Sequence, residues 1–200
     1  MSMDIPKQEE GSKMDVSAKT AFDHVEAAKV FYNIARMRLL EVYNWDELCN
    51  LPSATFILTD ELGNPVKRAV AEGDHFKIDI PGPGTEVGDG YDWVTVEQVY
   101  EESSAANQLT LIRVRPSSNP LHKSEETAHF FKDKATSTFT VTRIGNEVYA
   151  EVHGRNEIAN TDSSGIIDRI RNTIIGLSAK VGLSFPQWQS LVDGLVRNNG

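Results

Sequence analysis

The chain has 200 residues, of which 40% are hydrophobic and 24% are charged, and its net charge is −9 at neutral pH. This composition is that of an ordinary globular protein, and the length allows one large domain or two small ones with a sizeable core. Most of the excess negative charge lies within residues 60–102. It disfavours a nucleic-acid partner, because sequence-independent binding to phosphates depends on lysine and arginine.

Two features of the chain bear on its compartment. Uninterrupted apolar runs are only a few residues long, and the first fifteen residues lack the apolar stretch of a secretory signal. The single cysteine, Cys49, cannot form a disulfide within the chain and suits a reducing compartment. We therefore expect a cytoplasmic protein without a membrane span.

Residues 1–20 are polar and aperiodic, which predicts a disordered tail before a single domain over residues 21–200. A helix is predicted next, because apolar residues then recur every three or four positions. They are Ala28, Phe31, Tyr32, Ala35, Leu39 and Val42. The capping-box pattern of Asn44–Glu47 predicts a short second helix that ends before Pro52.

The middle of the chain has the pattern of β-strands. Four segments are rich in β-branched and aromatic residues: Thr55–Asp60, His75–Ile80, Trp93–Tyr100 and Leu109–Arg115. Apolar and polar residues alternate cleanly in His75–Ile80, which indicates an antiparallel sheet with one solvated face.

A β-hairpin is predicted over Thr136–Glu157, because Gly145-Asn146 is typical of a two-residue turn. Placing Ile144 opposite Glu147 brings apolar residues together on one face of both strands. The resulting pairs are Phe139 with Val152, Val141 with Ala150, and Arg143 with Val148. A shift of one residue would destroy this agreement, so the pattern fixes the register.

The C-terminal part is predicted to be helical. An isoleucine-rich stripe runs through Ile166–Val181 and ends at Gly182, and a second capping box begins an additional helix over residues 184–197. This last helix would bury Phe185, Trp188, Leu191, Val192 and Leu195. The predicted fold is thus α+β: an antiparallel sheet of about six or seven strands packed against an N-terminal helix and a long C-terminal helix.

A cluster of polar residues at the end of the hairpin is the main candidate site. Alternation along the strand places Gly154 and Asn156 on the core face, and places His153, Arg155 and Glu157 on the opposite face. A buried amide without a partner costs about 1–3 kcal/mol, so Asn156 must be hydrogen bonded. Two interpretations stay open: the cluster ties the strand to the following helix, or it lines a pocket.

No pattern predicts a cofactor or a particular reaction. His122, Glu125 or Glu126, and His129 could share one helical face and bind a metal. Their spacing matches neither H-E-x-x-H nor H-x-x-E-H, and a solvated turn is the simpler interpretation. There is no G-x-S-x-G sequence, and Cys49 has no histidine near it in the sequence.

The last two predicted helices also have the outline of a helix-turn-helix unit, with Gly182 in the turn and Ser184 as the cap. A recognition helix needs basic or amide groups for phosphates and bases. From Phe185 onward the only charged residues are Asp193 and Arg197, so DNA binding is the least favoured function.

The order of elements resembles that of the START-like helix-grip proteins. The helix Ala28–Val42, the strands from Thr55 to Glu157 and the helix Ile166–Val181 carry the resemblance, over residues 20–182. It implies a curved antiparallel sheet around the last helix, with a cavity for a lipid, sterol, polyketide or other apolar molecule. Two features depart from the pattern. The family begins with a strand, for which only Met14–Lys19 is available, and the helix after Gly182 is additional.

The favoured function is binding of a small, partly apolar or amphipathic ligand, such as a lipid, between the sheet and the C-terminal helix. The candidate ligand-binding residues are Trp93, Phe130, Phe131, Phe139, His153, Arg155 and Asn156. If the protein is an enzyme, cyclase, dehydratase or hydrolase chemistry in that cavity is expected, with His153 or His129 as the base. The alternative is an interaction module without ligand or catalysis, whose last helix uses Trp188 and Leu191 to form a homodimer or to dock a partner.

Overall fold

The computed structural model describes residues 5–49, 55–79, 89–122, 132, 134–158 and 186–198. In chain order the elements are β1 (Ser12–Ala21), α1 (Val25–Leu40), the 3-10 helix η1 (Val42–Asn44), α2 (Trp45–Leu48), β2 (Thr55–Thr59), β3 (His75–Asp79), β4 (Asp92–Ser103), β5 (Asn107–Pro116), β6 (Thr136–Ile144) and β7 (Glu147–Glu157). A further helix over residues 186–195, called here the C-terminal helix, follows. The predicted helix Ile166–Val181 lies outside the described residues.

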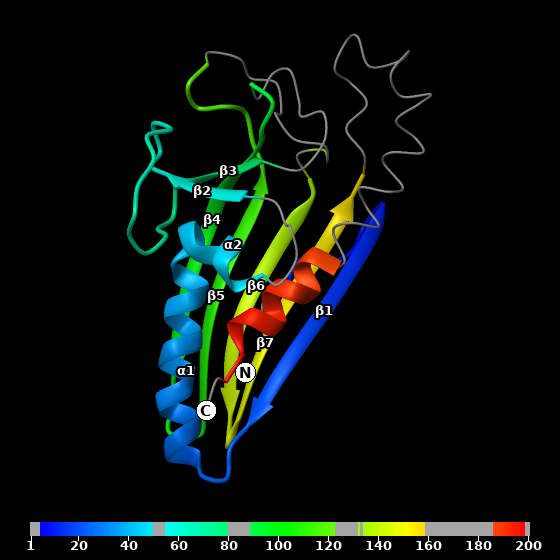
Figure 1. The fold of residues 1–200 in the computed structure, drawn as a ribbon. Coiled ribbons are helices and arrows are strands. Elements are labelled where there is room, and N and C mark those ends of the chain that lie inside the picture. The colour runs from blue at the N-terminus through cyan, green and yellow to red at the C-terminus, as the bar shows by residue number, and fades with distance from the viewer. Residues whose placement is uncertain are drawn as a thin grey trace.

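The strands form one seven-stranded sheet in the order β1-β7-β6-β5-β4-β3-β2, and every neighbouring pair is antiparallel (Figure 1). The predicted α+β class is confirmed. The register of the β6–β7 hairpin is also as predicted, with Phe139 opposite Val152 and Ile144 opposite Glu147. Alternation of apolar residues on two strands was sufficient to fix this pairing, because only one register buries both sets.

The prediction of a disordered tail over residues 1–20 is wrong for its second half. Ser12–Ala21 forms β1 at the edge of the sheet, where Val16 pairs with Val152 and Ala18 pairs with Ala150. Val16 is buried in the core, and Met14 and Ala18 pack against it. These three residues alternate with polar ones, and that pattern becomes informative only when β7 is available as a partner.

All the described helices lie on one face of the sheet, which we call the inner face (Figure 1). α1 packs on β5, β6 and β7, and the hydroxyl of Tyr32 bonds to that of Thr110 on β5 at 2.7 Å, both buried. At the surface, the Arg36 guanidinium pairs with both carboxylate oxygens of Glu101 on β4. These contacts fix the angle at which α1 crosses the sheet.

The C-terminal helix lies between α1 and β1 on the inner face (Figure 1), and its apolar residues Leu191, Val192 and Leu195 are completely buried. Its C-terminal end is capped by α1: Nη1 of Arg38 donates to the carbonyls of Gly194, Leu195 and Arg197 at 3.3, 3.1 and 2.8 Å. A cation at this end also complements the helix dipole. The helix is therefore part of the core of this domain.

Two further contacts hold this end of the helix. The Thr20 hydroxyl on β1 donates to the carbonyl of Val196 at 2.6 Å. Gly194 lies against α2 so closely that a Cβ atom there would collide with the Leu48 carbonyl.

Within the described residues, the structure contains no helix with the length and apolarity that crossing a membrane requires.

Candidate functional site

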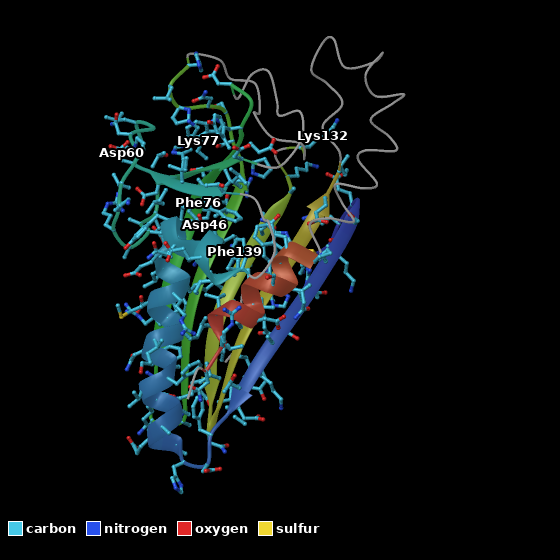
Figure 2. The ribbon with its side chains drawn as sticks, viewed as in Figure 1. Asp46, Asp60, Phe76, Lys77, Lys132 and Phe139 are labelled. Atoms are coloured by element: carbon cyan, nitrogen blue, oxygen red, sulfur yellow. The ribbon has the colours of Figure 1, made fainter. Side chains whose placement is uncertain are left out.

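An aromatic cluster occupies the inner face between β2, β3, β6 and the first turn of the C-terminal helix. Its members are Trp45, Phe56, Phe76, Phe139 and Trp188. Ring centroids lie 4.8 Å apart for Trp45 and Phe139, and 5.3 Å apart for Phe139 and Trp188. Figure 2 labels two members, Phe76 on β3 and Phe139 on β6. These separations are those of stabilising ring pairs.

Trp45 contacts three other rings of the aromatic cluster, those of Phe56, Phe76 and Phe139. It is completely buried at the start of α2, and its indole N–H is shared between the carbonyls of Arg38 and Leu39, each at 3.1 Å. Because its one polar atom is satisfied at the end of α1, this ring can lie in an apolar interior. Trp45 thus links α1 and α2 to the sheet.

Trp188 differs from the other members because it is only half-buried. It contacts Phe139 and Phe56, at 5.3 and 5.8 Å between centroids, and comes from the C-terminal helix. The capping by Arg38 and the contact of Gly194 with Leu48 hold that helix in place. The Trp188 ring is therefore held in a fixed place at the edge of the core, with part of its surface exposed.

The side chain of Asn156, a predicted pocket residue, is hydrogen bonded to the N-terminal segment. Its Oδ1 accepts from the backbone N–H groups of Glu9 and Glu10 at 2.7 and 3.2 Å, and its Nδ2 donates to the Lys7 carbonyl at 3.1 Å. Its own backbone N–H donates to Oε1 of Gln8 at 3.0 Å. The amide is thus satisfied within the chain, and its described hydrogen bonds tie the end of β7 to the N-terminal segment.

The backbone at Asn156 is left-handed, with φ of 56°, a conformation that asparagine tolerates better than most residues. This turn ends the regular alternation of side chains along β7. The prediction that assigned faces from alternation alone consequently holds through Arg155 and fails after it.

Arg155 and His153 lie on the outer face, as predicted, and both bind Asp15 on β1. Nη2 of Arg155 and Nδ1 of His153 each lie 2.7 Å from Oδ1 of Asp15. Burial opposes ionisation of Asp15, but the hydrogen bonds and charges of His153 and Arg155 outweigh it and lower the pKa of Asp15. This cluster fastens β1 to β7, and His153 faces away from the aromatic cluster, so it is not placed to act as a base there.

Glu157 lies on the inner face, where alternation had not placed it. A Cβ atom added to Gly154 would collide with Oε1 of Glu157 and would lie 3.4 Å from the Met14 Cβ. Met14 packs against the core, so the Glu157 carboxyl group covers Gly154 on the helix side of the sheet. Burial raises the pKa of Glu157, and the Ser12 hydroxyl and the Arg155 charge offset only part of this effect.

The other predicted site residues lie in different places. Trp93 is buried on the outer face beside His75, since its neighbour Val94 is the residue that enters the core. Its prediction as a residue of the inner cavity is wrong, because β4 begins in the opposite phase. Phe130, Phe131 and His129 lie outside the described residues. Among the predicted ligand-binding residues that the structure describes, Phe139 alone belongs to the aromatic cluster.

Nothing in the described part of the chain resembles a metal site: it holds no group of three or more histidine, cysteine, aspartate or glutamate side chains suited to one. His122 pairs instead with Asp89, whose Oδ2 lies 2.7 Å from the Nε2 of His122.

The roles of Trp45, Phe56, Phe76 and Glu157 were missed in the sequence analysis. The two phenylalanines had a visible signal, since both occupy core-facing positions of predicted strands, whereas Glu157 had none.

Comparison with known proteins gives structural similarities only, since no protein-family model and no curated protein matches the sequence. A hypothetical protein from Helicobacter pylori has a TM-score of 0.45 and 13% identity, over 92% of this chain and 86% of that one. A truncated norcoclaurine synthase from Thalictrum flavum has a TM-score of 0.38 and 8% identity, over 97% and 100% of the two chains. A START superfamily protein from Mycobacterium smegmatis has a TM-score of 0.33 and 10% identity, over 90% and 99%.

At identities of 13% or less, these similarities say nothing about what this chain does. The fold is defined by this chain's own strands: a continuous antiparallel sheet with α1, α2 and the C-terminal helix on a single face. The protein is an α+β protein built on one antiparallel sheet.

Proposed function

We propose that the protein binds a small, partly apolar molecule against the aromatic cluster, between the sheet and the C-terminal helix. The observation that carries this proposal is Trp188, which packs on Phe139 and Phe56 and yet stays half-buried. Ligand sites are typically apolar and aromatic surfaces with a few polar groups that fix orientation. A ligand that covers the remaining surface of Trp188 would gain contact with rings that are already held in place.

The proposed site is smaller than the one expected from the sequence. Leu191, Val192 and Leu195 fill the inner face below the aromatic cluster, and Asn156 and Arg155 are bound within the chain. The ligand-binding residues that we propose are therefore Phe56, Phe139 and Trp188. Phe130 and Phe131 stay predictions from the sequence.

The interaction-module alternative has less support. Leu191, which was to contact a partner, is completely buried in this chain's own core, and Arg38 and Thr20 hold the C-terminal helix at its end. An intermolecular contact through Leu191 would require the helix to detach from the sheet.

The experiment is a binding titration with naphthylethanol, a neutral probe, followed by saturation-transfer NMR and by calorimetry. Trp188→Ala should weaken binding about tenfold, because a ring contact and its burial are lost. Tyr100→Ala, which removes an exposed ring from β4, is the matched control and should leave affinity unchanged. Native mass spectrometry of freshly purified protein should also reveal a co-purifying small molecule. Equal affinity of the wild type and Trp188→Ala would refute the proposed site.

A further inference from the structure

The end of β7 carries the carboxyl group of Glu157, which lies on the inner face of the sheet against Gly154. Gly154 is the next inner-face residue of β7 after Val152, which pairs with Phe139. The absence of a side chain at position 154 makes the space that the Glu157 carboxyl group fills. Two residues along a strand span about 6.8 Å, so Glu157 covers the position next to the aromatic cluster.

The charge of this carboxyl group has little compensation within the described residues. Its Oε2 accepts a hydrogen bond of 3.3 Å from the Ser12 hydroxyl, and it forms no salt bridge with any described residue. The guanidinium of Arg155, the next charged residue back along β7, is directed to Asp15 and to the carbonyls of Met14 and Gly154. A half-buried carboxylate in this state gains free energy from any cation or hydrogen-bond donor that reaches it.

We infer that Glu157 is the polar anchor of the ligand site, and that the ligand class is an apolar or aromatic body carrying a protonated amine. The body lies against Phe139 and Trp188, and the ammonium group donates to the Glu157 carboxylate above Gly154. An anionic head would meet the same carboxylate and be repelled. This inference rests on the proposed function, because the aromatic cluster supplies the contact for the body.

Three probes with one ring system and different heads test this inference: naphthylethylamine, naphthylethanol and naphthylacetate. Affinities are measured by calorimetry at neutral pH on the full chain. We expect the wild type to prefer the amine over the alcohol by about tenfold to a hundredfold, which is the strength of a hydrogen bond to a charged group. Naphthylacetate should bind more weakly than the alcohol.

Two variants test the charge of the Glu157 carboxylate and its position separately. Glu157→Gln removes the charge, and should abolish the preference for the amine while the affinity for the alcohol stays within about twofold. Gly154→Ala keeps the acid but displaces it, because the new Cβ occupies the place of Oε1, and should reduce the same preference. Glu151→Gln, on the outer face of the same strand, is the control and should behave as the wild type.

The outcomes distinguish the two proposals. If the wild type binds the alcohol and the amine equally and Glu157→Gln changes neither, the ligand site stands and the role of Glu157 is overturned. If none of the probes binds the wild type, the ligand site itself is refuted and the anchor with it. A preference for the amine that survives in Glu157→Gln would assign it to another residue and also overturn the inference.

Discussion

Arg38 offers a direct test of the packing that positions Trp188. Its guanidinium bonds three carbonyls at the end of the C-terminal helix, and hydrogen bonds to a charged group contribute about 1.5–3 kcal/mol. The interaction of the charge with the helix dipole adds about 0.3–1 kcal/mol. Arg38→Met keeps most of the apolar stem, so we expect a loss of about 2–3 kcal/mol in the free energy of unfolding. For a domain of this size the Tm should fall by about 4–12 °C.

The matched control for this prediction is Arg36→Met on the same helix. Arg36 makes a two-bond pair with Glu101, but both side chains are about a third or more exposed, at 34% and 41%, so the loss should be at most about 1 kcal/mol. Urea unfolding gives both free energies, and hydrogen exchange reports the C-terminal helix separately. Exchange in residues 186–198 should accelerate in Arg38→Met alone. An equal effect of the two substitutions would show that the cap contributes nothing to docking of the helix.

Three further predictions concern the end of β7. Asn156→Gly keeps a residue that tolerates positive φ but removes the side-chain bonds, so it should destabilise the protein by about 1–3 kcal/mol and accelerate hydrogen exchange at Glu9 and Glu10; unchanged exchange there would contradict the tie. Asp15→Asn should destabilise by at most about 1 kcal/mol at neutral pH, because the Asp15 side chain is 44% exposed. Since the pKa of Asp15 is lowered in the folded state, its contribution is present above the ordinary value of 3.8 and is lost as the pH falls through the folded pKa, so the unfolding curves of variant and wild type should converge in acid. The pKa of Glu157 is raised, so the folded state takes up a proton more readily than the unfolded chain, and stability grows as the pH falls toward 4.5. Glu157→Gln should therefore raise the Tm at neutral pH and lose this advantage below pH 4.5; a lower Tm at neutral pH would argue against a desolvated carboxylate.

Much of the sheet could be predicted because its information is local. The alternation in His75–Ile80 and the turn at Gly145-Asn146 identify strands, and the two apolar faces of the last hairpin allow one register only. β1 escaped prediction because Met14, Val16 and Ala18 are a weak signal between polar residues. Its stability comes from β7, which lies more than 100 residues away in the sequence.

The candidate site was predicted less well, and its errors have definite causes. Trp93 was assigned to the cavity from its ring, but the pairing of β4 with β3 places it opposite Lys77 on the outer face. Trp188 and Trp45 come from different ends of the chain, and both contact Phe139 only because the helices share one face of the sheet.

The sequence by itself determined the class of fold, the pairing of the last two strands and the need of Asn156 for hydrogen-bond partners, because periodicity and the cost of burying an amide are properties of a short segment. Only the tertiary structure decided which groups those partners are, since Glu9 lies 147 residues from Asn156. It also decided the face of Glu157: the left-handed backbone at Asn156 reverses the alternation, and the empty side of Gly154 accepts the carboxyl group. A backbone conformation that depends on contacts with a distant segment cannot be deduced from the pattern of the strand alone.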